Sequence, residues 1–357
     1  MRIAVFHTAT ILSSWTVLTI PDELRGMGHE VFDGSIPVDG NGAVLNTLTP
    51  QQFEGYRAAM PSLAQLDSCD LVLVYGPEYV GRWLNSLYGL EGWRNLRCGL
   101  KAACYLETSR EAGRDFQYEL YRDGYDVHFY PARGDVERLG GLPSPPCVDT
   151  RMFCPQYPER LVSGGPLNEK NYAAGFVGSI YPKRAAFLSR LLPLLEGVEF
   201  RAGSVVARDL GGELPELWTQ LLVKNIRQMG IHVALPSNNA HMTVSRPFET
   251  LACGTFLLTY RTPDDFFIDG EHCRFYDPDR PEELARLIRY YSAHREEREA
   301  IARAGCVYVR GRFSRENVLA GLLETCRQHS EMRARRLTEG GRGTPSGLCP
   351  EATGLIA

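Results

Sequence analysis

Short apolar runs alternate with helical stretches along the first half of the chain. The runs with strand composition are residues 2–6, 29–34, 70–76, 100–107 and 126–132. The LVLV segment at 71–74 shows no alternation of polar and apolar positions, which is typical of strands covered on both faces. This rhythm predicts βα units on a parallel sheet.

The second half repeats the rhythm after an interruption. Residues 155–172 are polar and rich in Pro and Gly, which predicts a domain boundary there. We expect the later elements to be strands at 173–178, 198–203, 231–236, 255–259 and 273–277, and helices at 183–195 and 215–229.

The end of the chain is predicted to be helical and then disordered. Leu284, Leu287, Ile288 and Tyr291 recur at helical spacing, another helix ends at Gly305, and a last helix spans 314–328 with Ser314 as its N-cap. We therefore expect an N-terminal domain at 1–160, a C-terminal domain at 161–330, and a tail at 331–357 with too little apolar content to pack.

Composition narrows the class of protein. The 357 residues are 44% hydrophobic and 23% charged, as in a globular chain of two domains. The formal net charge of -4 comes from interspersed residues, so nucleic acid is not an expected partner. No apolar run is long enough to insert in a membrane. The ten cysteines form no CxxC motif, and with no signal peptide at the N-terminus they indicate reduced thiols in the cytoplasm. The sequence gives no indication of the oligomeric state.

A charge pair stands at the start of a helix in the stretch SRPFETLACGTFLLT, residues 245–259. Arg246 and Glu249 lie in the first turn, where free N–H groups and the positive dipole end favour a phosphate. A carboxylate there can accept both hydroxyls of a ribose. Gly254 would let the chain turn tightly into the following strand. The alternative is an ordinary helix start with a surface arginine.

A second basic pair follows a predicted strand in GFVGSIYPKRAAFL, residues 175–188. Gly178 and Ser179 form a short loop of small residues, and Lys183 and Arg184 fall in the next helical turn. Small residues permit close approach of a ligand, and the cations suit a diphosphate. The alternative is a solvated surface pair.

The segment from Asn225 to about Leu323 resembles the carboxyl-terminal domain of GT-B glycosyltransferases, and it is similar to the CgeB-type, group 1 (family 4-like) branch. The matching motifs are SNNAHMTVSRPFETLACGTFLLT, DDFFIDGEHCRFYD and RFSRENVLAGLLE. The resemblance implies an α/β fold of the GT-B type, with two Rossmann-like parallel α/β domains facing a cleft. It also implies that CVDTRMFCP, residues 147–155, is a structural segment near the linker.

The same resemblance implies a donor site. Glu249 would hold the ribose of a nucleotide sugar, with Arg246 near the diphosphate and Arg184 at the usual basic position. His241 replaces the first of two glutamates eight positions apart, and Ser179 stands where many relatives have Arg. The loop residues expected to contact the donor are Asn238, Asn239, His241, Thr243 and Ser245.

The N-terminal domain is expected to hold the acceptor. His7 and Glu107 follow predicted strands and are the candidate catalytic bases. Either residue could instead be structural, as a satisfied loop histidine or a helix cap. The candidate acceptor contacts are Ser13, Ser14, Trp15, Glu78 and Tyr79.

These features predict a glycosyltransferase that needs no metal and no cofactor. Its donor would be a UDP- or GDP-type nucleotide-diphosphate sugar, and its acceptor a small molecule such as a natural product. Two alternatives remain: a GT-B sugar-nucleotide epimerase or phosphorylase, and a non-catalytic nucleotide-sugar-binding protein of spore or cell-surface assembly.

Overall fold

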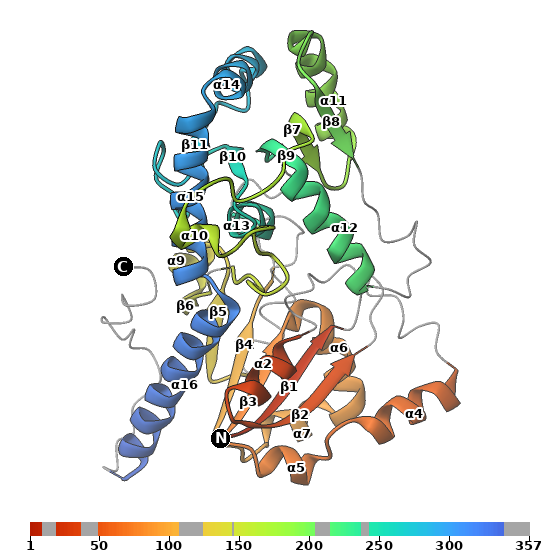
Figure 1. The fold of residues 1–357 in the computed structure, drawn as a ribbon. Coiled ribbons are helices and arrows are strands. Elements are labelled where there is room, and N and C mark those ends of the chain that lie inside the picture. The colour runs from red at the N-terminus through yellow and green to blue at the C-terminus, as the bar shows by residue number, and fades with distance from the viewer. Residues whose placement is uncertain are drawn as a thin grey trace. The chain divides into compact units, whose positions relative to one another are not determined.

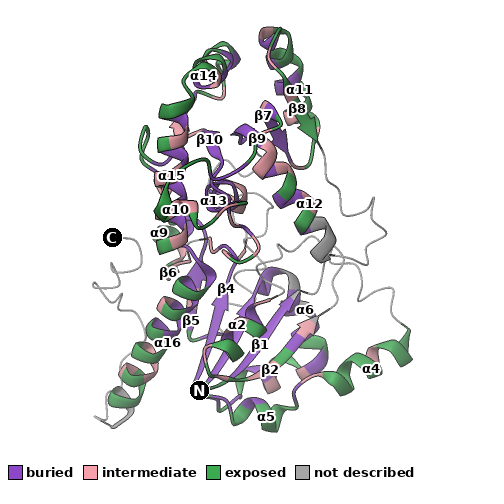
Figure 2. Ribbon diagram, viewed as in Figure 1, coloured by how far each residue is buried: buried purple, intermediate pink, exposed green. Residues whose placement is uncertain are grey.

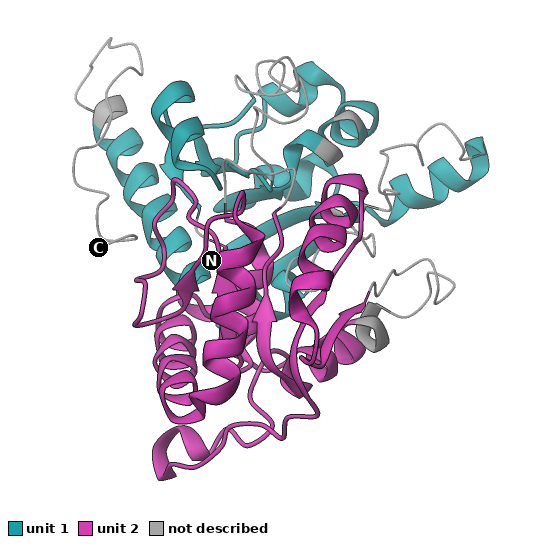
Figure 3. Ribbon diagram, turned by 90° about the horizontal axis from the view of Figure 1, so that it is seen from above, with its two compact units in different colours: residues 1–145, 318–357 teal, residues 146–317 magenta. Residues whose placement is uncertain are grey.

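The protein forms two compact α/β units (Figures 1 and 3). The computed structural model describes residues 1–8, 19–36, 49–106, 124–144, 146–203, 215–236 and 243–338, apart from the side chains at 8, 36, 79, 82, 215–218 and 336–338. Unit 1 comprises Met1–Pro145 and Val318–Ala357, and unit 2 comprises Pro146–Asn317.

Unit 1 is built on a parallel six-stranded sheet of order β2-β1-β3-β4-β5-β6. The strands are β1 Arg2–Thr8, β2 Glu30–Ile36, β3 Leu71–Tyr75, β4 Leu100–Cys104, β5 Val127–Tyr130 and β6 Leu142–Pro143. The helices are α2 Ile20–Gly26, α4 Pro50–Ala59, α5 Leu63–Asp67, α6 Pro77–Tyr88, α7 Leu90–Arg94, α9 Arg133–Leu139 and most of α16 Arg315–Thr338. The predicted strands of this half are confirmed.

Alternate residues of β1 pack into two hydrophobic cores, one on each face of the unit 1 sheet. Ala4 and Phe6 of β1 pack with Trp83 of α6 on one face. Ile3 and Val5 pack on the other face, against α2 and α16. Because both faces are covered, the central strands β3 and β4 are buried along their whole length. Figure 2 shows β4 in the colour of buried residues.

Unit 2 contains a parallel five-stranded sheet of order β11-β10-β9-β7-β8. The strands are β7 Tyr172–Val177, β8 Phe200–Gly203, β9 Met229–Val233, β10 Phe256–Thr259 and β11 Arg274–Phe275. The helices are α10 Arg160–Ser163, α11 Pro182–Leu191, the 3-10 turn η2 Leu192–Leu195, α12 Pro215–Gln228, α13 Ser245–Ala252, α14 Pro281–Ala293 and α15 Arg295–Arg312. These elements match the predicted series, except that α15 does not end at Gly305 as predicted but continues to Arg312.

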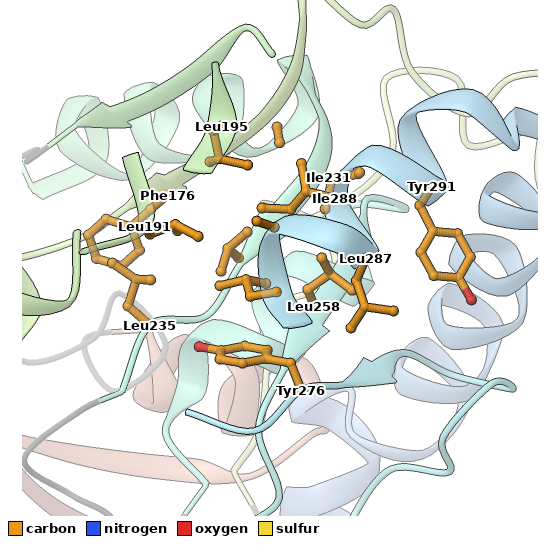
Figure 4. Close-up of a cluster of buried hydrophobic side chains, with 14 of the residues drawn as sticks. Phe176, Leu191, Leu195, Ile231, Leu235, Leu258, Tyr276, Leu287, Ile288 and Tyr291 are labelled. Carbon is orange, nitrogen blue, oxygen red and sulfur yellow. The ribbon is translucent and has the colours of Figure 1, made fainter. Parts of the chain in front are cut away.

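The unit 2 sheet is also covered on both faces. Residues of α11 and α14 pack on one side, against Phe176, Ile231 and Leu258 (Figure 4). Residues of α12, α13 and α15 pack on the other. Gly254, with φ 66°, makes the tight turn from α13 toward β10; a side chain there would lie 2.7 Å from Leu167.

The division of the chain differs from the predicted one in two ways. The first unit ends at Pro145 rather than near residue 160, and the chain returns to it at Val318. Leu319, Leu322 and Leu323 do face inward as expected, but they pack on the sheet of unit 1. An apolar helical stripe does not specify which of two sheets it covers.

The last helix is longer than predicted. Ser314 caps it as expected, since its Oγ accepts the N–H of Asn317, but α16 continues to Thr338. Residues 329–338 contain no Gly or Pro, and Arg327 pairs with both Glu324 and Glu331 along the surface. The expected disorder of 339–357 lies outside the described residues. No helix in the described part of the chain has the length and apolarity needed to span a membrane.

Candidate functional site

A hollow of about 210 Å³ lies where three neighbouring strands of unit 2 end. Its floor and walls follow β7, β9 and β10 at their carboxyl ends, the usual ligand position in parallel α/β sheets. The lining residues are Phe176, Val177, Gly178, Ser179, Arg184, Ala234, Leu235, Thr243, Val244, Ser245, Arg246, Pro247, Thr259, Tyr260 and Thr262. Phe176 and Leu235 also belong to the core shown in Figure 4, which makes this floor rigid.

The first turn of α13 forms one wall. Val244 is the N-cap and no side chain caps the helix, so the amino end carries its positive partial charge into the hollow. Arg246 Nη1 donates to Glu249 Oε2 at 2.6 Å. Glu249 is only 4% exposed and lies behind Arg246 rather than in the lining. The predicted pair is thus a buried ion pair at the edge of the hollow.

Arg184 holds the loops on the opposite wall. Its Nη1 donates to the Ser179 carbonyl at 2.9 Å and its Nε to the Pro236 carbonyl at 3.3 Å. The guanidinium also lies over the rings of Tyr181 and Phe176, at 4.6 Å and 5.2 Å from their centroids. Among the described residues no carboxylate forms an ion pair with it, so its charge is available to an anion.

The electrostatics of the hollow favour an anionic ligand. Burial is the main cause that lowers the pKa of Arg184, and the nearby charge of Arg246 adds to it. Two guanidinium groups with one carboxylate leave a net positive charge, and a bound anion would relieve their repulsion.

The small residues of the β7–α11 loop allow close approach. A Cβ on Gly178 would meet the Phe176 ring at 3.0 Å, so a larger residue there would require that ring to shift. Lys183 does not line this hollow. It lines a neighbouring one of about 400 Å³ that also includes Arg190 and Arg261 and shares Tyr260.

Thr243 is anchored from the loop after β10. Its N–H donates to Asp264 Oδ2 at 2.8 Å, and its hydroxyl bonds the Thr262 hydroxyl. Neither Thr262 nor Asp264 was predicted, although TYRTPDD follows a buried strand just as the predicted motifs do. Asn238, Asn239 and His241 lie outside the described residues.

The acceptor candidates of unit 1 are only partly described. His7 is the penultimate residue of β1 and is 2% exposed, with Nε2 at 3.2 Å from Asp33 Oδ1 on β2. Burial raises the pKa of Asp33, but the hydrogen bond and charge of His7, together with Arg25, outweigh burial and lower it. Asp33 is therefore ionised and orients the imidazole, a partner that the sequence did not reveal.

Glu78 has a structural contact in unit 1. It is buried in the first turn of α6, and its Oε1 accepts the Leu106 N–H at 2.8 Å, which ties α6 to the end of β4. Tyr79 lies on the same helix, and its side chain is outside the described part. Ser13, Ser14, Trp15 and Glu107 also lie outside the described residues.

Comparisons with known proteins agree with this geometry. Residues 184–324 match the family model described as glycosyl transferase-like, a segment that begins at Arg184 and includes Arg246 and Glu249. No curated protein matches the chain.

Solved structures share the whole fold at low identity. Sucrose-phosphate synthase from Thermosynechococcus elongatus has a TM-score of 0.58 at 12% identity, over 96% of this chain and 100% of that one. HepE from Anabaena in complex with UDP-glucose has a TM-score of 0.60 at 13%, over 94% and 100%. An alpha-glucosyltransferase in complex with UDP-glucose and DNA has a TM-score of 0.59 at 12%, over 91% and 99%. The predicted GT-B fold and the resemblance to glycosyltransferases are confirmed; the comparisons do not test the CgeB-like branch.

Proposed function

We propose that this chain, with its GT-B fold and a glycosyl transferase-like domain at 184–324, transfers a sugar from a nucleotide-diphosphate sugar to an acceptor bound by unit 1. The observation that carries the proposal is the pair of arginines, Arg184 and Arg246, on one hollow at the carboxyl ends of β7, β9 and β10. Arginine binds phosphate oxygens through paired donors, so two of them suit a diphosphate.

Glu249 is proposed to bind the ribose. In the free protein its Oε2 is bonded to Arg246. A diphosphate would compete for that guanidinium, and the released carboxylate would then accept hydrogen bonds from the ribose hydroxyls. The ion pair would thus keep a buried carboxylate satisfied until the donor arrives.

The arginines and the amino end of α13 would also stabilise the leaving group, the nucleoside diphosphate. Two guanidinium groups and the amino end of α13 supply positive charge where the diphosphate accumulates negative charge as the sugar leaves. We therefore propose transfer without a metal ion.

His7 is proposed as the base of an inverting reaction. Asp33 accepts the Nε2–H of His7, and the imidazole would take the proton of the acceptor hydroxyl as the general base. The acceptor oxygen forms a bond to the anomeric carbon as the bond from that carbon to the diphosphate breaks. Asp33 would stabilise the imidazolium that results.

The acceptor is proposed to be a small molecule. The net charge of -4 disfavours a nucleic acid, even though one structural neighbour was solved with DNA.

The protein is proposed to act in the cytoplasm. The nine cysteines in the described part are free thiols, which supports that location.

A thermal-shift screen with UDP, GDP, dTDP and ADP tests the donor site. At a concentration about 100-fold above Kd, a diphosphate bound only by the native state adds about 2.7 kcal/mol of stability. We expect one diphosphate to raise Tm. Glu249→Ala should weaken its binding about 30-fold, because a carboxylate hydrogen bond contributes about 2 kcal/mol.

Glu324→Ala is the matched control for that variant. Glu324 likewise pairs with an arginine three positions away in the same helix, Arg327, at 2.6 Å, but it lies on the surface of α16 in unit 1. It should respond to the diphosphate like the wild type. Equal affinity in Glu249→Ala would overturn the ribose assignment, and no Tm shift with any diphosphate would overturn the donor site.

A further inference from the structure

A buried histidine lies beneath the candidate donor site without taking part in its lining. His232 is the penultimate residue of β9 and is 0% exposed. Thr250, on the second turn of α13, is equally buried and contacts it. Both residues are polar members of an otherwise apolar region.

A directed chain of hydrogen bonds joins His232 to the first turn of α13. Thr250 Oγ1 donates to the Arg246 carbonyl at 2.8 Å. His232 Nδ1 lies 3.0 Å from Thr250 Oγ1. The Thr250 hydroxyl has one hydrogen, and a carbonyl can only accept. Because that hydrogen is donated to the Arg246 carbonyl, His232 Nδ1 is the donor to Thr250 Oγ1. The chain therefore runs from the strand through Thr250 to the backbone of Arg246.

The imidazole ring is also connected to Arg184, through the ring of Phe176. It stacks on Phe176, with ring centroids 6.5 Å apart and planes at 20°. Phe176 carries the Arg184 guanidinium on its ring. One buried side chain thus supports both walls of the hollow.

The protonation state of His232 suits this support. Burial, with the charges of Arg246 and Arg184, lowers its pKa to about 3, although the Val177 backbone acts in the opposite direction. The ring is therefore neutral and adds no third positive charge. Its Nε2 has no hydrogen-bond partner among the described residues.

An apolar side chain would avoid that unsatisfied nitrogen, so the packing of the sheet does not by itself explain a histidine here. We propose that His232 and Thr250 are positioning residues, which fix Arg246 through its backbone and Arg184 through Phe176 for binding of the diphosphate. This inference rests on the proposed donor site.

Isothermal titration with UDP and GDP tests the inference in pairs of variants. Thr250→Val keeps the shape of threonine but loses the hydroxyl, and should weaken nucleoside diphosphate binding about tenfold. Thr250→Ser keeps the hydroxyl and should bind within about twofold of the wild type. Likewise, His232→Leu should lose affinity, whereas His232→Asn, whose amide can replace the Nδ1 donor, should recover most of it.

A matched control separates positioning from general loss of stability. Thr325 in α16 is buried and donates to the Gly321 carbonyl at 2.9 Å, the same bond within a helix of unit 1. Thr325→Val should leave the affinity unchanged even if it lowers Tm. Loss of affinity in Thr250→Val and His232→Leu, with recovery in Thr250→Ser and His232→Asn, would support the inference.

Equal affinity across the Thr250 variants would overturn the inference and leave the donor site intact. If Thr250→Val does not fold, the affinities of His232→Leu and His232→Asn test the inference by the same criterion. A wild type that binds none of UDP, GDP, dTDP and ADP would instead overturn the proposed function, which keeps the two failures distinct.

Discussion

Replacing His7 with alanine is expected to lower kcat for sugar transfer about a thousandfold while nucleoside diphosphate affinity stays at the wild-type level, because a general base contributes roughly 10²–10⁴ to the rate. His7 is in unit 1, whereas the donor contacts are in unit 2. The two measurements are steady-state kinetics and titration of the diphosphate. A large loss of rate without loss of affinity would identify a group that acts on the acceptor.

Asp33→Asn and His29→Ala sharpen this test. Asp33→Asn keeps the size of the side chain but removes the charge that stabilises the imidazolium, so we expect a loss of kcat of about tenfold to a hundredfold. His29 precedes β2 at the opposite end of the same sheet, and His29→Ala should retain full activity. Wild-type turnover in His7→Ala would exclude it as the base.

Most of the fold could be predicted because the signals are local. Parallel strands covered on both faces are apolar without interruption, and LVLV and FLLT could be recognised on that basis. The two-residue strand β6 carries no such signal. The return of α16 to unit 1 could not be predicted, because Leu319 and Leu322 specify an apolar stripe and not its partner.

The candidate site was partly predictable for a related reason. Arg184, Arg246 and Glu249 lie at the start of helices that follow predicted strands, on the side where ligands of parallel sheets bind. His232 lies within the apolar run IHVALP and gives no such sign. Its role depends on contacts with Thr250 and Phe176, which are distant in sequence.

Asp149→Ala is expected to lower the free energy of unfolding by about 3–5 kcal/mol, the usual cost of removing one partner of a buried ion pair. Asp149 Oδ2 lies 2.9 Å from Arg315 Nη2, and Oδ1 accepts the N–H groups of Arg151 and Met152. Arg315 is 2% exposed and would lose this buried carboxylate partner. The predicted structural role of CVDTRMFCP rests on these contacts, which join the segments where the chain enters and leaves unit 2.

Urea denaturation of Asp149→Ala against Glu331→Ala measures this effect. Glu331 pairs with Arg327 on the exposed face of α16, and its removal should cost less than about 1 kcal/mol. A similar small loss in Asp149→Ala would contradict a stabilising role for the buried pair.

The contribution of Asp149 should also disappear in acid. Burial raises the pKa of Asp149, but Arg315 and the two backbone N–H groups outweigh it and bring the pKa below its ordinary value of 3.8. Because the folded-state pKa is the lower one, the native state favours the ionised form, and this stabilisation is present above pH 3.8. It is lost as the pH falls through the folded-state pKa. The difference in unfolding free energy between the wild type and Asp149→Ala should therefore be largest near neutrality and shrink below pH 3.8, and a difference independent of pH would show that the charge of Asp149 is not its source.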